Sequence, residues 1–498
     1  MSEGLSNLSW LSTSESQALS NTFATSFDIG IDLIGIQKTG KGKNIVRGVA
    51  FADANAVSDA SAIANNESDL VAFAFSGAEA NAASSSTAVG LKNSGKLRTG
   101  KDRDVFRGIS FANAVAGSGS LSEATAAAEF GLAVAVAESR ATAYADAFAV
   151  GVHNAHKAVI KTKSGGDVIN GRAFANANAA AVTGTRAFVA GILAESQANV
   201  NKIDVATSLT VLGINNSGKL KTGTGGDRIR GVAIGNGGAW ADAGITVAAA
   251  IADAAASANA TATVSSRIST IAIGLNNGGN GKRQGLVKTG KGHDTVTGIG
   301  IVDSANAVAN ASAAAEAHAK SSTSTAVTFT TAKTDTIEAI GINNIGGVIE
   351  LDGGKDTLRA YGSTYGLIGG KVDLGMGDDI LHAGIIKSYE GSTGKVTSFH
   401  QDQNRALEDV RVLGGPGDDT FILYSVFGTN ALLRGGAGFD QLQLPGNIDQ
   451  YSITVGATDK KEVFIERNGA SLSVQGVEQF HIGNQAFNFN DLASAQSI

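Results

Sequence analysis

The sequence predicts an all-β protein, an elongated parallel β-solenoid or β-roll built from internal repeats. Three observations support this prediction: a super-repeat of about 60 residues, small residues that alternate with other types between the turns, and a composition of 65 Gly, 2 Pro and no Cys in 498 residues. Such an uneven composition is typical of one repetitive architecture. The absence of cysteine excludes disulfides, thiol catalysis and Cys-ligated zinc.

Two markers define the super-repeat. The turn QKTGKGKNIV from Gln37 returns five times, and its aspartate position recurs at steps of 60 to 67 residues. That position falls at Asn44, Asp104, Asp167, Asp227, Asp294, Asp356 and Asp419. A second marker, which reads GLKN, GVHN, GINN, GLNN and GINN, keeps the same interval from Gly90 to Gly341. Two independent markers with one period indicate a true structural repeat.

The size of one coil follows from the C-terminal turns, where the motif is denser. Asp356, Asp379, Asp419 and Asp440 are separated by 23, 40 and 21 residues. A unit of about 20 residues explains these spacings, so we expect coils of about 20 residues and three coils in each super-repeat. Stacked at about 4.8 Å per coil, they would form a rod on the order of 100 Å long.

Between the turns, alternation with a period of two predicts strands. Ala50, Ala52, Ala54 and Ala56 alternate with larger or polar residues, as do the alanines of TAYADAFAVG from Thr142. We expect the small residues to point into a thin interior. An alanine-rich helix is the alternative, since alanine is the best helix former, but Gly, Asn, Ser and Thr interrupt these stretches.

The chain is predicted to have four parts. Residues 1–31 form a polar N-terminal segment or cap, 32–350 the Ala/Gly-rich solenoid, 351–445 acidic coils, and 446–498 a C-terminal cap. Of the net charge of −6, residues 341–498 contribute −8, with 19 acidic and 11 basic residues. Acid is therefore concentrated in the C-terminal coils.

Neither a membrane anchor nor a cleaved leader is predicted. No apolar run reaches the roughly 18 residues that span a bilayer. The segment Met1 to Ser12 lacks a basic region followed by an apolar stretch and a cleavage site.

The turns have a chemistry of their own. Glycines permit the positive φ of a tight corner, and the final aspartate can hydrogen-bond the turn backbone or bind a hard cation. The strings LGGPGDDTF from Leu413 and LRGGAGFDQL from Leu433 resemble the nonapeptide repeats of the RTX (hemolysin-type) calcium-binding family. That resemblance implies Ca²⁺ held between turns of successive coils by aspartate carboxylates and glycine carbonyls.

We expect calcium only at the acidic C-terminal turns. Like charges about 5 Å apart repel by about 3 kcal/mol at an effective dielectric of 20, and a bound cation relieves this repulsion. The predicted metal ligands are Asp356, Gly375, Gly377, Asp378, Asp379, Gly415, Gly417, Asp418, Asp419, Gly436, Gly438 and Asp440. The N-terminal turns carry Lys38, Lys41, Arg98 and Lys101, and with three coils per repeat they would lie roughly 14 Å apart, so an aspartate cap without metal is expected there.

The C-terminal tail carries a second resemblance. GVEQFHIGNQAFNFNDL from Gly476 is similar to the end of many type I secreted RTX proteins, in which Val-Glu precedes an aromatic-rich strand, a turn and Asp-Leu. The matching residues are Val477, Glu478, Phe480, Phe487, Phe489, Asp491 and Leu492. The resemblance implies export by a bacterial type I secretion apparatus. An amphipathic capping hairpin is the structural alternative, and both can hold together.

Other motifs carry less weight. GIQKTGK from Gly35 and GLVKTGK from Gly285 lack the Ser or Thr that would hold magnesium in a phosphate loop. His153 and His156 have no third zinc ligand nearby in the sequence. An acidic total and few aromatic residues argue against nucleic acid.

These features predict a non-enzymatic, secreted structural protein of the bacterial cell surface or extracellular matrix. Self-association into fibres or layers is expected from open coil edges, with surface or matrix polysaccharide as a further partner. Two alternatives stay open: a polysaccharide lyase or epimerase on a β-helix, and an ice-binding face at the threonine-rich TSTAVTFTTAKT from Thr323.

Overall fold

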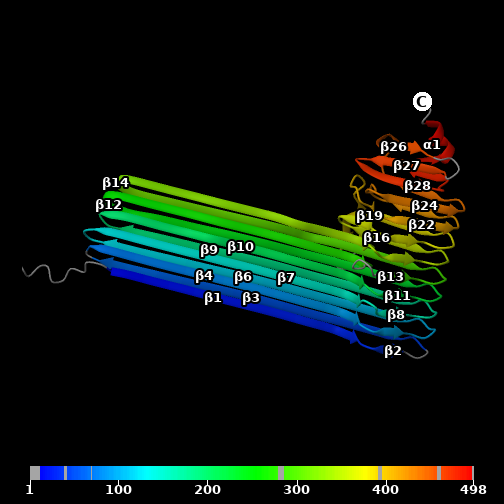
Figure 1. Ribbon diagram of the computed structural model, residues 1–498, viewed down its shortest axis with the longest axis horizontal. Coiled ribbons are helices and arrows are strands. Elements are labelled where there is room, and N and C mark those ends of the chain that lie inside the picture. The colour runs from blue at the N-terminus through cyan, green and yellow to red at the C-terminus, as the bar shows by residue number, and fades with distance from the viewer. Residues whose placement is uncertain are drawn as a thin grey trace, which may run out of the picture.

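The computed structural model describes residues 12–38, 42–68, 70–278, 285–390, 395–456 and 461–495. It confirms an all-β fold of long parallel strands stacked as a solenoid. Figure 1 shows two parts, a broad slab of long strands and a narrow column of short strands that continues beyond the slab to the C-terminus. Within the described residues, no helix is long and apolar enough to cross a membrane.

The slab has two facing sheets, because each coil runs out along one strand and returns along another. The outgoing strands are β3 (Ile45–Ser68), β6 (Val105–Ala128) and β9 (Val168–Ala190). The returning strands are β1 (Ser12–Leu33), β4 (Val71–Asn93), β7 (Leu132–Asn154) and β10 (Leu193–Asn216). In β12 (Arg228–Asn276) and β14 (Thr295–Asn343) both directions belong to one continuous strand of 49 residues.

A third, short strand closes each coil on the column side. These strands are β2 (Ile36–Lys38), β5 (Lys96–Arg98), β8 (Val159–Lys161), β11 (Lys219–Lys221), β13 (Leu286–Lys288), β15 (Val348–Glu350) and β18 (Lys371–Asp373). Each pairs in parallel with the next, as Figure 1 shows along the column.

The expected coil size is wrong for the slab. Ile45 pairs with Val105 and Val71 with Leu132, so one coil is the whole super-repeat rather than a third of it. The alternating stretches have no internal turn that could divide them, and each forms a single strand of 22 residues or more. Consecutive turns therefore lie on adjacent coils, and the slab is wide rather than rod-like.

Where the column continues beyond the slab the coils are short, as the denser turns predict. Thr357 pairs with Ile380, and Thr420 pairs with Gln441. The coil from Ile380 to Thr420 is longer, because an antiparallel hairpin is inserted within it. The column strands are β16 (Thr357–Gly362), β17 (Tyr365–Ile368), β19 (Ile380–Glu390), β20 (Lys395–Phe399), β21 (Leu407–Glu408), β22 (Arg411–Pro416), β23 (Thr420–Leu423), β24 (Ala431–Ala437) and β25 (Gln441–Leu444).

The two parts have different cores. In the slab the interior is mostly alanine, and Ala50, Ala52, Ala54 and Ala56 are buried as the alternation predicts. In the column, the larger side chains of leucine, isoleucine, valine and phenylalanine fill the interior. At the junction of slab and column the outgoing and returning strands come close together, and glycines make this approach possible. A Cβ on Gly108 of β6 would lie 1.8 Å from the carbonyl oxygen of Gly151 of β7.

The chain ends differ from simple caps. Most of the predicted N-terminal segment 1–31 forms β1, while residues 1–11 lie outside the described residues. At the other end the strands turn antiparallel and Phe480 lies opposite Phe487. These elements are a 3₁₀ turn (Ile448–Gln450), β26 (Ser452–Val455), β27 (Glu462–Arg467), β28 (Ala470–Gln475), β29 (Gln479–Ile482), β30 (Gln485–Asn488) and α1 (Phe489–Ala495).

Candidate functional site

The turn aspartates form one continuous stack, which we call the aspartate ladder: Asp104, Asp167, Asp227, Asp294, Asp356, Asp379, Asp419 and Asp440. The backbone N–H of each donates to Oδ1 of the aspartate on the next coil, at 2.7 to 2.9 Å. Asn44 donates to Asp104 at one end, and Asp440 donates to Oε2 of Glu478 at the other.

Every ladder carboxylate is buried, and one of its oxygens is left over. None of the eight residues is more than 2% exposed, and Oδ2 of each accepts no well-formed hydrogen bond among the described residues. The hydroxyls of Thr162 and Thr222 lie close enough to Asp167 and Asp227 to favour the charged form of these two aspartates. A buried charge without a good partner is costly, so these oxygens are places where a bound cation would be favourable.

The pKa values of the ladder aspartates reflect the cost of burying their charge. Burial, reinforced by neighbouring carboxylates, outweighs the hydrogen bonds that favour the charged form. It raises the pKa of Asp227, Asp356 and Asp419 to about 7, of Asp379 to about 8 and of Asp440 to about 6. The pKa of Asp167 and Asp294 is raised by burial as well.

Stacked glycines hold the turns in place. Gly377, Gly417 and Gly438 have φ values of 127°, 141° and 139°. A Cβ on Gly417 would lie 2.0 Å from the carbonyl oxygen of Gly377, and one on Gly438 would lie 2.1 Å from that of Gly417. Gly375, Gly415 and Gly436 form a parallel stack, also at positive φ. Both the close approach and the backbone conformation therefore require glycine.

The predicted metal ligands separate into two groups. Asp356, Asp379, Asp419 and Asp440 lie in the ladder, one coil apart. Asp378 and Asp418 point outward instead. Asp378 Oδ2 accepts from Lys355 Nζ at 2.6 Å, and this contact lowers the pKa of Asp378. Asp418 Oδ1 accepts from the backbone N–H of Phe439 at 2.8 Å.

The expectation that two further coils separate successive N-terminal turns is wrong. The backbone N–H of Asp104 donates directly to Oδ1 of Asp167 at 2.7 Å, because each repeat is one coil. The four N-terminal aspartates thus belong to the same ladder as the C-terminal ones. Their constant spacing in the sequence is the signal of this ladder, and each interval corresponds to one coil rather than three.

The ladder offers calcium a partial ligand set. Oδ2 and the glycine carbonyls are the hard oxygen ligands that Ca²⁺ prefers. Across the described residues, however, no three His, Cys, Asp or Glu side chains converge as a metal-binding group. A cation at the turns would have to take most of its ligands from backbone carbonyls, with one carboxylate oxygen per coil.

A second stack, of asparagines, explains the other sequence marker. The last residue of each GLKN-type motif is buried at the junction of slab and column. Its Nδ2 donates to Oδ1 of the next coil's asparagine at 2.7 to 2.8 Å, from Asn93 through Asn154, Asn216 and Asn277 to Asn344. These amides are neutral and mutually satisfied, so their role is structural.

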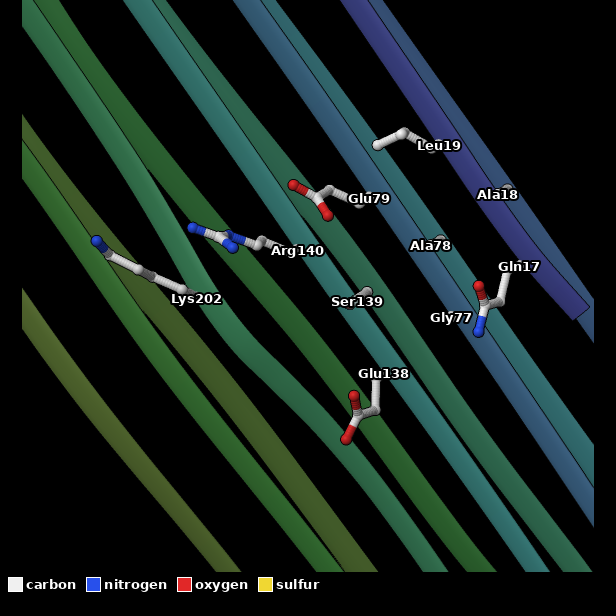
Figure 2. A pocket seen from close by; sticks show the side chains of 10 residues that line it. All are labelled: Gln17, Ala18, Leu19, Gly77, Ala78, Glu79, Glu138, Ser139, Arg140 and Lys202. Carbon is white, nitrogen blue, oxygen red and sulfur yellow. The ribbon is translucent and has the colours of Figure 1, made fainter.

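A shallow depression of about 610 Å³ lies on the outer face of the slab across β1, β4, β7 and β10. Figure 2 shows Glu79, Arg140 and Lys202 following one another across three neighbouring strands, with Glu138 set apart. Lys202 is paired with Asp204 at 3.0 Å. The charged groups are spread along a flat face rather than converging on one point where a substrate could react.

Comparison with family models, curated proteins and solved structures finds no match to this chain.

Proposed function

We propose that this chain is a secreted, calcium-associated structural protein of the bacterial cell surface or extracellular matrix, which assembles with copies of itself. The observation that carries the proposal is the pair of open sheet edges on the slab. We propose further that the turns are of the RTX type and that export follows the type I route, as the C-terminal resemblance implies. The proposed role is non-enzymatic.

One open edge is formed by β14. It pairs with β16 only from Thr295 to Gly300, and with β17 only near Ile340 to Asn343. Within the described residues, positions 301–339 have no strand partner on that side. Figure 1 shows β14 along the top of the slab, which it follows to the part of the column that holds β16 and β19.

The opposite edge is formed by β1 and β3. Among the described strands, β1 pairs only with β4, and β3 only with β6. Phe23 and Phe27 of β1 are 75% and 69% exposed. Unpaired backbone groups and exposed apolar side chains on a long strand are a ready template for another chain, which supports self-assembly.

The aspartate ladder is the proposed site of calcium binding. Eight buried carboxylates with unpartnered oxygens favour a cation in a calcium-rich medium, and the acidic turns of residues 351–445 carry the densest set. Bound calcium would stabilise the column without taking part in any reaction.

Electron microscopy of the purified chain, with calcium and with chelator, tests the assembly. We expect filaments or layers in calcium, while monodisperse particles in both conditions would contradict assembly. Isothermal titration of the chelated protein tests the metal separately, and an absence of calcium uptake up to millimolar concentrations would reject that part.

A further inference from the structure

The short strands of the column place cations in a single file. Lys38 pairs with Arg98, Arg98 with Lys161, Lys161 with Lys221, and Lys221 with Lys288. We call these five residues the cation ladder. Adjacent strands are about 4.8 Å apart, so five positive charges follow one another over roughly 20 Å along the solenoid axis.

The orientation of these side chains is fixed by the strands. The middle residue of each described three-residue strand from β5 to β13 points inward and is buried: Leu97, Ile160, Leu220 and Val287. Period-two alternation therefore directs the flanking residues outward. Lys38, Arg98 and Lys161 are exposed, and Lys221 and Lys288 are half-buried.

The ladder is extended by further cations on the same face. Lys96 and Lys219 lie two residues before Arg98 and Lys221 on the same strands, and both are exposed. Lys163 follows β8 in the adjoining turn and is exposed too.

Most of this charge is uncompensated. Lys288 binds Glu350 at 3.0 Å and Asp352 at 2.7 Å, so its charge is neutralised where the ladder meets the acidic coils. Within the part of the chain that the structure describes, Lys38, Arg98, Lys161 and Lys221 have no ion pair.

Elsewhere the solenoid matches opposite charges across coils. Lys92 binds Asp32 at 3.1 Å, and Arg186 binds Glu123 at 3.0 Å. Like charges directly opposite one another in a sheet are destabilising. Single like pairs occur on the long strands, Arg47 with Arg107 and Arg140 with Lys202, whereas the cation ladder continues over five coils.

Protection of a sheet edge does not explain the ladder. Lysines on edge strands discourage unwanted pairing, but β5, β8, β11 and β13 each have a strand partner on both sides. Among these described strands, only β2 lies at an edge. The charges of the inner strands therefore need another explanation.

We propose that the cation ladder binds a linear acidic polysaccharide, one that carries carboxylate or sulfate groups along its length. This inference rests on the proposed extracellular role, where such polymers are encountered. A single file of cations suits an extended polyanion aligned with the solenoid axis. A small anion would engage one or two rungs only.

The neighbouring side chains favour polysaccharide over nucleic acid. Ile36, Val159 and Leu286 occupy the remaining outward positions of these strands, and no aromatic residue lies on β2, β5, β8, β11 or β13. Proteins that bind single-stranded nucleic acid combine basic grooves with aromatic side chains on which bases stack.

The test compares two variants of the full chain with equal loss of charge. The first carries Arg98→Gln, Lys161→Gln and Lys221→Gln in the ladder. The control carries Arg140→Gln, Lys157→Gln and Lys387→Gln at exposed positions outside it. Binding is measured by titration with polygalacturonate and dextran sulfate at low salt, and neutral dextran serves as the uncharged probe.

We expect the ladder variant to bind both polyanions at least tenfold more weakly than the parent, and the control variant to stay within twofold. Neutral dextran should not bind. Thermal unfolding of the ladder variant should occur no lower than in the parent, because like-charge repulsion is removed, and this outcome separates lost binding from lost fold.

Three outcomes would overturn the inference: a ladder variant that binds within twofold of the parent, a control that loses as much, or neutral dextran that binds equally well. Tighter binding of oligothymidylate or of phosphatidylserine vesicles would assign the surface to nucleic acid or membrane instead. Calcium uptake and assembly are measured on the same variants. If both persist without polyanion binding, only this inference fails and the proposed structural function stands.

Discussion

At the scale of single residues, the aspartate ladder holds a charge that can be neutralised in two ways. An unfolded aspartate ionises near pH 4, whereas five ladder aspartates ionise between about pH 6 and 8: Asp227, Asp356, Asp379, Asp419 and Asp440. Between about pH 4 and pH 8 the folded chain therefore binds more protons than the unfolded chain. Without metal, its free energy of unfolding therefore falls as pH rises through this range. A bound cation would replace the protons and reduce that fall.

Asp419→Asn tests this account. Asparagine can still accept the N–H of Asp379 through Oδ1, and Asn44 already occupies a ladder position in the first turn. In chelator, we expect the parent to be less stable at pH 8 than at pH 5, and the variant to remove about 2 kcal/mol of that difference. Urea unfolding at the two pH values measures it.

Asp378→Asn is the matched control for that measurement. Asp378 lies next to a ladder residue, but its side chain is 45% exposed and paired with Lys355. The pKa of Asp378 is lowered, so this residue stays ionised from pH 5 to pH 8 and affects the ladder only through its charge, which contributes to the raised pKa of Asp379 and Asp419. Its replacement should therefore remove much less of the difference between pH 5 and pH 8 than Asp419→Asn does. Equal effects of the two variants would refute the assignment of the pH dependence to the buried ladder.

The turn glycines allow a second test at the residue scale. Gly417→Ala places a Cβ 2.0 Å from the carbonyl oxygen of Gly377 at a φ of 141°. We expect a loss of at least about 2 kcal/mol in the free energy of unfolding. Gly77→Ala on β4 meets no atom within 4 Å and should change stability by about 0.5 kcal/mol or less. Denaturant titration of both variants distinguishes close packing from a general intolerance of substitution.

The sequence predicts part of this site. The turn motif identifies Asp379 and Gly377, and alternation from the buried Leu381 would place Asp379 inside and Asp378 outside. The hydrogen bond from Asp379 to Asp419 could not be predicted from spacing alone, because it depends on which turns are adjacent. The separation of these two aspartates along the chain fits either one coil with an insertion or two coils.

At the scale of elements, alternation predicts strands correctly but leaves their length open. In β3 the small residues run from Ala50 past Ala64 without a turn signal, and the structure makes the whole stretch one strand. Denser turns after residue 350 do give short coils. The C-terminal coil length does not apply to the slab, because its turns are much rarer.

The open edge of β14 leads to a prediction of its own. Ala311 and Ala315 point into the slab and pack half-buried against its alanine core. Ala311→Lys with Ala315→Lys places inward charges at this edge, a device that discourages edge-to-edge pairing. We expect the variant to remain folded and to lose calcium-dependent assembly by electron microscopy. Asn310→Lys with Ser312→Lys, on the outward face of the same strand, should assemble like the parent.

At the scale of the whole molecule, the aspartate ladder joins two parts whose cores are packed differently. The slab has a thin alanine core, and its inner strands have partners on both sides. The column is narrower, with a core of large aliphatic and aromatic residues, and it carries most of the acidic turns. A rod could not be distinguished from this shape by composition, because both stack the same turns along one axis.

This division predicts where calcium acts. In hydrogen exchange of the full chain, transfer from calcium to chelator at pH 7.5 should increase exchange chiefly in residues 351–445, where ladder carboxylates lose their cation. Amides of β6 and β7 should stay slow in both conditions, because each strand is hydrogen-bonded to neighbours on both sides. Acidification to pH 5 in chelator should restore part of the protection, since protons then neutralise the ladder in place of calcium. Equal changes of exchange in slab and column would show that the ladder does not couple ion binding to the stability of the column. Protection that is the same with and without calcium and at both pH values would show this too.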